Sequence, residues 1–373
     1  MDGGNGRRRV LVITKYLPDG PPSGGLIRTE VLIDALRRRY DVRVLGYVER
    51  GDGPRPRSRV SSLVNGLLTR RAYSVARWDT RWMRIRIAEE MARFAPEAVF
   101  VDHSQVAPLA DGLGLPRAMD MHNVESIFAQ GVADTTRGPT RHLAARDARL
   151  LRKLEQRIAD EYELVVVNSP KEAERAAGSP EVIPNGVFPE KTPLEAPPDP
   201  DLITFVALFS WLPNIDGAEW LVNEVMPLLP PRVRVRLVGR DPHPRVKALA
   251  GPRVEVTGEV PETWSYVSAG LLALCPILST GGTRHKILEG LLAERPVVST
   301  RMGAEGLEDL EGHGLVLAET PEEFARAVTE LMDDPARAAE LGRLGRRTVI
   351  ERYDWARIGE QFADLFAARL GLD

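Results

Sequence analysis

Residues 278–300 read LSTGGTRHKILEGLLAERPVVST, and this stretch decides how the chain is interpreted. It continues an apolar run that begins at Leu271 and is short enough to be a buried strand. After Gly281 and Gly282 the apolar residues recur at helical spacing, and residues 297–300 read as a second buried strand. The pattern therefore predicts a strand, a helix and a parallel strand in succession.

The corner between the first strand and the helix has features of an anion site. Thr283 is suited to cap the helix, and the glycine pair lets a ligand approach the first free N–H groups. Arg284 and Lys286 stand in the first turn, where they oppose the helix dipole unless an anion is bound. Glu289 offers a carboxylate for a pair of sugar hydroxyls. An ordinary β-α-β corner with solvated charges is the alternative interpretation.

Composition sets limits on the class of protein. A chain of 373 residues is expected to form about two domains, and 43% hydrophobic with 28% charged residues is ordinary for a globular protein. The net charge of -3 argues against general nucleic-acid binding. Cys275, the only cysteine, lies in an apolar run and is expected to be buried and inert. Neither a signal peptide nor a membrane-length apolar run is recognised, so we expect a cytoplasmic protein.

Strand and helix patterns alternate in both halves of the chain. In the first half, apolar runs at residues 9–14, 41–48, 97–102, 117–121 and 164–168 predict strands of a parallel sheet. Five prolines in residues 187–201 predict a linker. In the second half, residues 202–209 predict a strand and residues 214–229 an amphipathic helix. The expected domains are residues 1–186 and 202–354, with residues 355–373 packing back on the first. The space between two such domains is the expected ligand site.

Several polar residues follow predicted strands of the first half. Gly24 and Gly25 close the loop after the first strand, although no G-x-G-x-x-G pattern for a dinucleotide is present. His122 and Asn123 follow the strand that ends at Met121, so they are expected at the same sheet edge as the glycines. Glu125 is expected in the first turn of the helix that follows. It either contacts the acceptor or is simply an acidic residue that the helix dipole favours at this position. His103 is expected to be a structural residue.

An arginine-rich segment, residues 50–77, interleaves basic and apolar residues. One interpretation is a flap that meets an anionic acceptor or the surface of an anionic membrane. The other is a solvent-exposed surface segment that contains a short amphipathic helix.

The chain resembles the retaining glycosyltransferases of family 4, the glycosyl transferases group 1, in five stretches. Their order along the chain is also that of the family, and they read PPSGG (21–25), MHNVES (121–126), IPNGV (183–187), FSWLPN (209–214) and the donor-site segment 278–300.

The resemblance implies a GT-B fold, with two Rossmann-like domains facing each other across a cleft and a C-terminal helix, residues 355–370, that crosses back to the first domain. It implies transfer from a UDP- or GDP-linked sugar to an acceptor hydroxyl on a carbohydrate, lipid or natural product. His122 would then lie near the transferred sugar, Gly24 and Gly25 near the donor phosphates and the acceptor, and Glu289 at the ribose.

Two departures from the family pattern concern the donor site. The first of two glutamates that many members share corresponds here to Gly281, which leaves the donor sugar open. The usual Arg and Lys after the first strand of the second domain are replaced by a stretch that begins at Ser210. Arg284 and Lys286 are expected to neutralise the phosphates instead, with Arg240 as a further cation. Base recognition is assigned to backbone groups around Gly258 to Val260.

The reaction is expected to need no metal and no other cofactor, because no suitably placed D-x-D triplet is found and the cations supply the charge. A front-face mechanism, in which the leaving phosphate helps to deprotonate the acceptor, needs no protein nucleophile. Two alternatives stay open: a nucleotide-sugar epimerase or hydrolase of the same fold, and a non-catalytic two-lobed sugar-binding protein.

Overall fold

The computed structural model describes residues 6–17, 24–48, 54–191, 197–279 and 285–372. The chain divides into two compact units. The first domain comprises Met1–Pro184 with Ile358–Asp373, and the second comprises Asn185–Arg357. Within the described ranges, no helix is both long enough and apolar enough to cross a bilayer.

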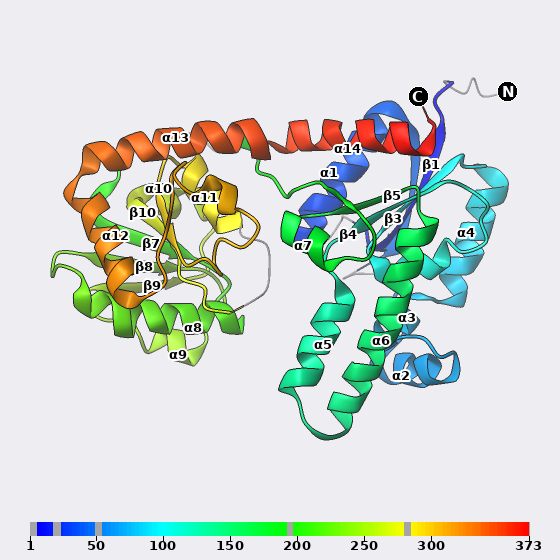
Figure 1. Cartoon of the computed structure of the whole chain (residues 1–373), viewed down its shortest axis with the longest axis horizontal. Helices are drawn as coiled ribbons and strands as arrows, with labels where there is room; N and C mark the ends of the chain where they lie inside the picture. Colours follow the sequence, from blue (N-terminus) through cyan, green and yellow to red (C-terminus); the bar gives the residue numbers. More distant parts are fainter. Residues whose placement is uncertain (1–5, 18–23, 49–53, 192–196, 280–284, 373) are drawn as a thin grey trace. The chain divides into compact units, whose positions relative to one another are not determined.

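The first domain contains a six-stranded parallel sheet in the order β2-β1-β3-β4-β5-β6. Figure 1 labels β1, β3, β4 and β5 of this sheet. Its strands are β1 (Arg9–Tyr16), β2 (Asp41–Tyr47), β3 (Ala98–Asp102), β4 (Arg117–Met121), β5 (Leu164–Val167) and β6 (Glu181–Val182). Its helices are α1 (Gly24–Arg39), α2 (Arg59–Leu68), α3 (Tyr73–Trp78), α4 (Arg81–Arg93), the 3-10 turn η1 (Ser104–Leu109), α5 (Glu125–Thr135), α6 (Gly138–Glu161) and α7 (Pro170–Arg175).

The strand register places three polar residues in one row across this sheet. Thr14 on β1 lies opposite Asp102 on β3, and Asp102 lies opposite Asp120 on β4. All three side chains are completely buried. Each of the three residues lies near the carboxyl end of its strand, and α/β sheets bind their ligands at this edge.

The last helix, α14 (Trp355–Leu370), packs in the first domain from Ile358 onward. The ring of Phe362 lies 5.1 Å from that of Phe100 in β3, and Phe366 lies 5.8 Å from Tyr40 at the end of α1. A Cβ at Gly359 would come within 3.2 Å of Ala35, so the glycine permits close contact with α1. The predicted return of the C-terminal helix to the first domain is confirmed.

The second domain contains another six-stranded parallel sheet, in the order β12-β11-β10-β7-β8-β9. Its strands are β7 (Asp199–Val206), β8 (Arg234–Val238), β9 (Val254–Gly258), β10 (Gly270–Cys275), β11 (Val297–Ser299) and β12 (Leu315–Leu317). Its helical elements are η2 (Pro189–Lys191), α8 (Leu212–Trp220), η3 (Leu221–Val225), η4 (Met226–Leu228), α9 (Pro244–Lys247), α10 (Trp264–Ala269), α11 (His285–Leu292), η5 (Glu308–Leu310), α12 (Pro321–Asp333) and α13 (Pro335–Tyr353).

Two predicted strands of this domain have different bounds in the structure. The apolar run 271–278 ends as a strand at Cys275, because Pro276 cannot donate a backbone hydrogen bond to a neighbouring strand. The strand predicted at 202–209 begins at Asp199 and ends at Val206, and an ion pair of 2.6 Å between Asp199 and Arg234 holds its early start. Cys275 is buried as predicted, with its thiol 3.4 Å from the carbonyl of Gly303.

The helix predicted at residues 214–229 is broken in the structure. It begins as α8, widens into a π-helical segment at Leu221–Val225 and ends in a 3-10 turn. Pro227 lies in that last turn and lacks the N–H group that a continuing α-helix would need. The apolar spacing alone did not reveal this change of winding.

Candidate active site

His122, at the end of β4, lies in a buried cluster of charged side chains. Its Nε2 is 2.8 Å from Asp102 Oδ1 and 3.2 Å from Asp120 Oδ2. Asp102 also accepts hydrogen bonds from the hydroxyls of Thr14 (2.6 Å) and Thr29 (2.9 Å). The cluster therefore joins three neighbouring strands to α1 at the carboxyl edge of the sheet.

Arg28 on α1 completes the cluster from the other side of Asp120. Its guanidinium binds both oxygens of that carboxylate in a bidentate pair, with two N–O distances of 2.8 Å. The same guanidinium donates to the carbonyls of Ile183 (2.7 Å) and Pro184 (3.3 Å). Arg28 is 1% exposed and Asp120 is fully buried, so this pair is shielded from water.

Among Asp102, Asp120, Arg28 and His122, the charges balance if His122 is protonated. Two buried carboxylates, those of Asp102 and Asp120, face one guanidinium, and a buried uncompensated charge is costly. Burial alone would lower the pKa of His122, but Asp120 and Asp102 beside it raise that pKa to about 9. Although burial acts in the opposite direction, Arg28 and His122 hold the pKa of Asp120 below its usual range. At neutral pH the imidazole of His122 is therefore a cation.

His103 stacks on His122, with ring centroids 3.8 Å apart and planes tilted by 15°. Its Nδ1 lies 3.0 Å from Asp102 Oδ2, and burial together with the neighbouring His122 lowers its pKa to about 4. Asp102, His103 and His122 are thus close enough to be considered as metal ligands. However, the two near-parallel rings direct their nitrogens at separate oxygens of one carboxylate. This arrangement fits hydrogen bonds better than a shared metal ion.

The other ring nitrogen of His122 faces the start of α1. A Cβ built on Gly25 would lie 3.5 Å from His122 Nδ1, so the absence of a side chain leaves that nitrogen accessible. Gly24 is the first residue of the same helix. Asn123 is exposed directly after His122, whose carbonyl accepts a hydrogen bond of 2.7 Å from Asn168. Glu125 is half-buried at the first turn of α5.

Lys286 is held at the carboxyl edge of the second sheet. Its Nζ lies 2.8 Å from Asn214 Oδ1 and 4.7 Å from the centre of the Phe205 ring. Asn214 is itself oriented by a hydrogen bond of 2.9 Å from its Nδ2 to the carbonyl of Leu208. The ammonium group is therefore positioned by residues of β7 and α8 at the start of α11.

Glu289 lies one turn further along α11. Burial raises its pKa to about 7, although the positive charge of Lys286 opposes the rise. His285, at the first position of the helix, has a pKa lowered by burial to about 4. Its Nε2 is buried and has no hydrogen-bond partner within the described part of the chain.

The remaining predicted donor-site residues also follow strands of the second sheet. Ser210 is exposed just before α8, and Arg240 is exposed after β8. Gly258 ends β9 with a φ of 74°, and Val260 is half-buried beyond it. Gly281, Gly282, Thr283 and Arg284 lie outside the described residues.

Five polar residues of the buried cluster had not been predicted as parts of a site: Thr14, Arg28, Thr29, Asp102 and Asp120. The available signal was an aspartate within each of two apolar strands, VFVD and MDM. Such aspartates are rarely buried without a partner, so they indicate a cation nearby. Nothing in the local pattern of α1 marks Arg28 as that partner.

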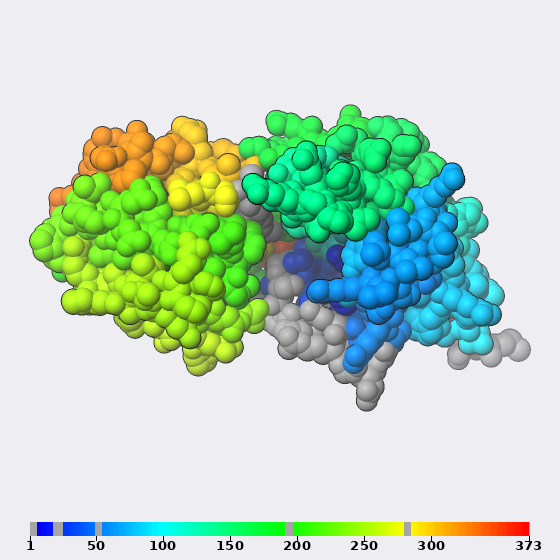
Figure 2. All heavy atoms as spheres, turned by 90° about the horizontal axis from the view of Figure 1, so that it is seen from below, coloured from blue at the N-terminus to red at the C-terminus, as the bar shows by residue number. Residues whose placement is uncertain are grey.

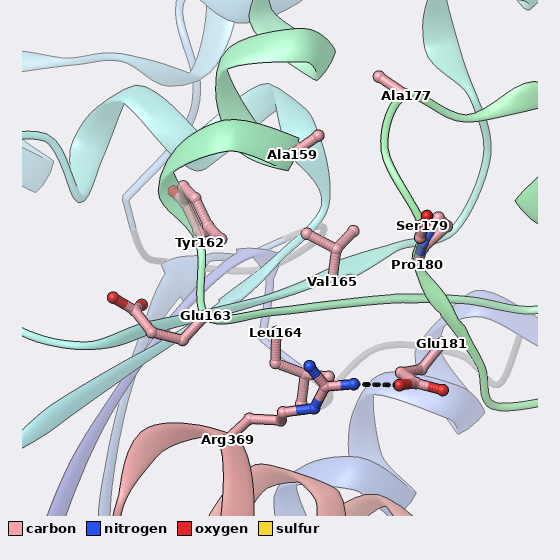
Figure 3. A pocket seen from close by; sticks show the side chains of 10 residues that line it. All are labelled: Ala159, Tyr162, Glu163, Leu164, Val165, Ala177, Ser179, Pro180, Glu181 and Arg369. Carbon is pink, nitrogen blue, oxygen red and sulfur yellow. Dashed lines mark hydrogen bonds and ion pairs between the residues drawn. The ribbon is translucent and has the colours of Figure 1, made fainter.

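A small cavity lies at the opposite, amino edge of the first sheet (Figure 3). It has a volume of about 180 Å³ and lies where β5 and β6 begin, beside Tyr162 and Glu163. Arg369 of α14 forms an ion pair with Glu181 there. None of the residues considered above lines this cavity.

Part of the amino-acid sequence matches a known protein family. Residues 200–334 match the family model described as glycosyl transferases group 1. This segment contains Lys286, Glu289 and Asn214. None of the curated proteins matches the chain.

Solved structures resemble the chain over nearly its whole length. Sucrose-phosphate synthase of Thermosynechococcus elongatus has 17% identity and a TM-score of 0.70, over 98% of this chain and 100% of that one. Anabaena HepE in complex with UDP-glucose has 16% identity and a TM-score of 0.65, over 96% and 99%. WaaG, a glycosyltransferase involved in lipopolysaccharide biosynthesis, has 15% identity and a TM-score of 0.64, over 95% and 99%. These likenesses confirm the predicted GT-B fold.

The first prediction concerns the stability of the buried cluster. Arg28→Met removes the cation from Asp120 and should lower the free energy of unfolding by about 3–5 kcal/mol, measured by urea denaturation. The control is Arg39→Ala, which breaks an exposed ion pair with Asp364 and should cost about 1 kcal/mol or less. If Arg28→Met does not fold, the isosteric Asp120→Asn tests the same pair. Equal effects of the cluster and control variants would contradict the charge account.

Proposed function

Because residues 200–334 match the model of the glycosyl transferases group 1 family, we propose that the chain transfers a sugar from a UDP- or GDP-linked donor to an acceptor hydroxyl. The proposal includes retention of the anomeric configuration and independence from a metal ion. HepE, which shares the fold, binds UDP-glucose, and this supports a nucleotide-sugar donor.

The position of Lys286 carries the proposal. A leaving nucleoside diphosphate gains negative charge as the glycosidic bond breaks, and a fixed cation stabilises that charge. Lys286 stands at the start of α11, where Asn214 and Phe205 restrict its movement. We assign the diphosphate to this ammonium group, to the backbone N–H groups after Gly281 and Gly282, and to Arg284. Arg240 is assigned as a further cation near the phosphates.

Glu289 is assigned to the ribose of the donor. Two ribose hydroxyls can donate to one carboxylate, and these bonds favour the charged form of a group whose pKa is otherwise about 7. Gly258 and Val260, after β9, are assigned to the base through their backbone groups. Ser210 is assigned to the donor site because it lies just before α8, after the first strand of the second domain.

His122 is proposed to act as a charged hydrogen-bond donor and not as a base. Its Nε2 is occupied by two carboxylates, and the raised pKa keeps both ring nitrogens protonated at neutral pH. The Nδ1–H group, which faces Gly25, is then available to an oxygen of the donor. Gly24, Asn123 and Glu125 are assigned to the phosphates and the acceptor.

This assignment fits a front-face reaction. Since no general base is required of His122, an oxygen of the leaving phosphate takes the proton of the acceptor hydroxyl as that hydroxyl attacks the anomeric carbon. The bond to the diphosphate breaks, and the new glycosidic bond forms on the same face of the sugar.

The second prediction tests the diphosphate site. Lys286→Met keeps the length of the side chain but removes its charge, so transfer should lose about 2–4 kcal/mol of transition-state stabilisation in kcat/KM. Lys247→Met, at an exposed position of α9, should leave kcat/KM unchanged. The assay is release of nucleoside diphosphate from a panel of UDP- and GDP-sugars. A Lys286→Met enzyme with wild-type kcat/KM would remove this residue from the mechanism.

The third prediction tests access to His122. In Gly25→Ala the new methyl group would touch His122 Nδ1 without a clash and cover it, so activity should fall about tenfold or more. The free energy of unfolding should be unchanged or rise by up to about 1 kcal/mol, because alanine has a higher helix propensity than glycine. Gly131→Ala, on an open face of α5, should show the same stability effect at full activity. Full activity of both variants would contradict the role given to His122.

A further inference from the structure

Helix α2 turns its apolar side chains away from the protein. Four of them share an exposed face, with exposed fractions of 75%, 51%, 50% and 79%: Val60, Val64, Leu67 and Leu68. The opposite face carries Ser62 and Gly66, and both are buried. This polarity is the reverse of an ordinary surface helix, whose apolar stripe faces the core.

Packing on α6 fixes this orientation. The guanidinium of Arg146 donates to the carbonyl of Gly66 at 2.8 Å and to that of Arg71 at 3.2 Å. A Cβ on Gly66 would lie 3.1 Å from the Arg71 carbonyl in the turn that follows α2, so a side chain there would push against this turn. A rotation of α2 that buried its leucines would break these contacts.

The surroundings of this face are strongly basic. Residues 54–78 contain no aspartate or glutamate and have six arginines: Arg55, Arg57, Arg59, Arg70, Arg71 and Arg77. The whole chain has a net charge of -3, so the positive charge is a local feature. Arg57 and Arg71 contact Asp79 inside the fold, whereas Arg59 and Arg70 are exposed at the two ends of α2.

We propose that the exposed face of α2 docks on a lipid bilayer that contains anionic headgroups. The four apolar side chains enter the boundary between headgroups and acyl chains, and Arg59 and Arg70 lie at the level of the phosphates. Figure 2 shows the blue atoms of this segment on the outside of its domain. The surface is separate from the residues assigned to sugar transfer, so the inference stands independently of the proposed function.

Charge favours a bilayer over a second copy of this chain. Two copies joined through α2 would bring two arginine-rich segments together, with no acidic residue in either segment to offset the repulsion. A bilayer offers an apolar layer for the four exposed side chains and a plane of negative charge for the arginines around them.

The fourth prediction tests docking with the full chain and two kinds of vesicle. Sedimentation at low salt should capture the protein on phosphatidylcholine vesicles that contain phosphatidylglycerol, but only weakly on pure phosphatidylcholine, and high salt should release it. Leu67→Ser with Leu68→Ser should weaken partitioning about tenfold or more. Arg59→Gln with Arg70→Gln should weaken it about fivefold for each arginine removed.

Matched substitutions in the second domain serve as controls. Leu228→Ser changes an exposed leucine, and Arg343→Gln with Arg347→Gln changes two exposed arginines; neither should affect partitioning. The α2 variants should retain the wild-type circular dichroism spectrum and the wild-type release of nucleoside diphosphate from the donor. Failure to bind anionic vesicles would overturn the proposal, as would equal binding to both vesicle types. Self-association that the leucine variant abolishes would instead identify a second copy as the occupant.

Discussion

Charge balance in a buried cluster is the constraint on which the first domain depends. Asp102 and Asp120 are buried side by side on neighbouring strands, and their charges must be met by Arg28 and His122. Because Arg28 also binds the carbonyls of Ile183 and Pro184, the same cation ties α1 to the end of the domain. Loss of a single member would leave a buried charge without a partner, which costs several kcal/mol. The same residues therefore have two effects. They hold the strands and α1 together, and they set the protonation state of His122.

The two domains contribute cations in different ways. In the first, His122 is buried beside two carboxylates, which raise its pKa to about 9 and so favour its charged form at neutral pH. In the second, Lys286 is positioned by the amide of Asn214 and the ring of Phe205, and its positive charge also acts on the buried carboxyl of Glu289. The place of this ammonium group at the start of α11 supports the assignment of the diphosphate to the second domain.

Much of the fold could be predicted from the sequence because long periodic segments report secondary structure directly. The strand at Arg117–Met121 and the helix at Trp355–Leu370 have the predicted bounds. The winding of residues 221–228 could not be predicted, since a π-helical turn keeps nearly the same apolar pattern as an α-helix. At the site, His122 was predicted from its place after a strand, but its charge was not. That charge depends on Asp102, Asp120 and Arg28, which come together only through strand register and helix packing.

Titration of the histidine rings by NMR tests the central claim most directly. In the wild-type protein, with resonances assigned through His122→Gln and His103→Gln, the ring nitrogens of His122 should both stay protonated through neutral pH and titrate near pH 9. His103 should be neutral at neutral pH and become protonated only near pH 4. In Asp120→Asn the transition of His122 should move to lower pH, because one of its two carboxylate partners is gone. A wild-type His122 that titrates at or below its ordinary value of 6.5 would contradict the account, since the buried carboxylates would then lack their second cation.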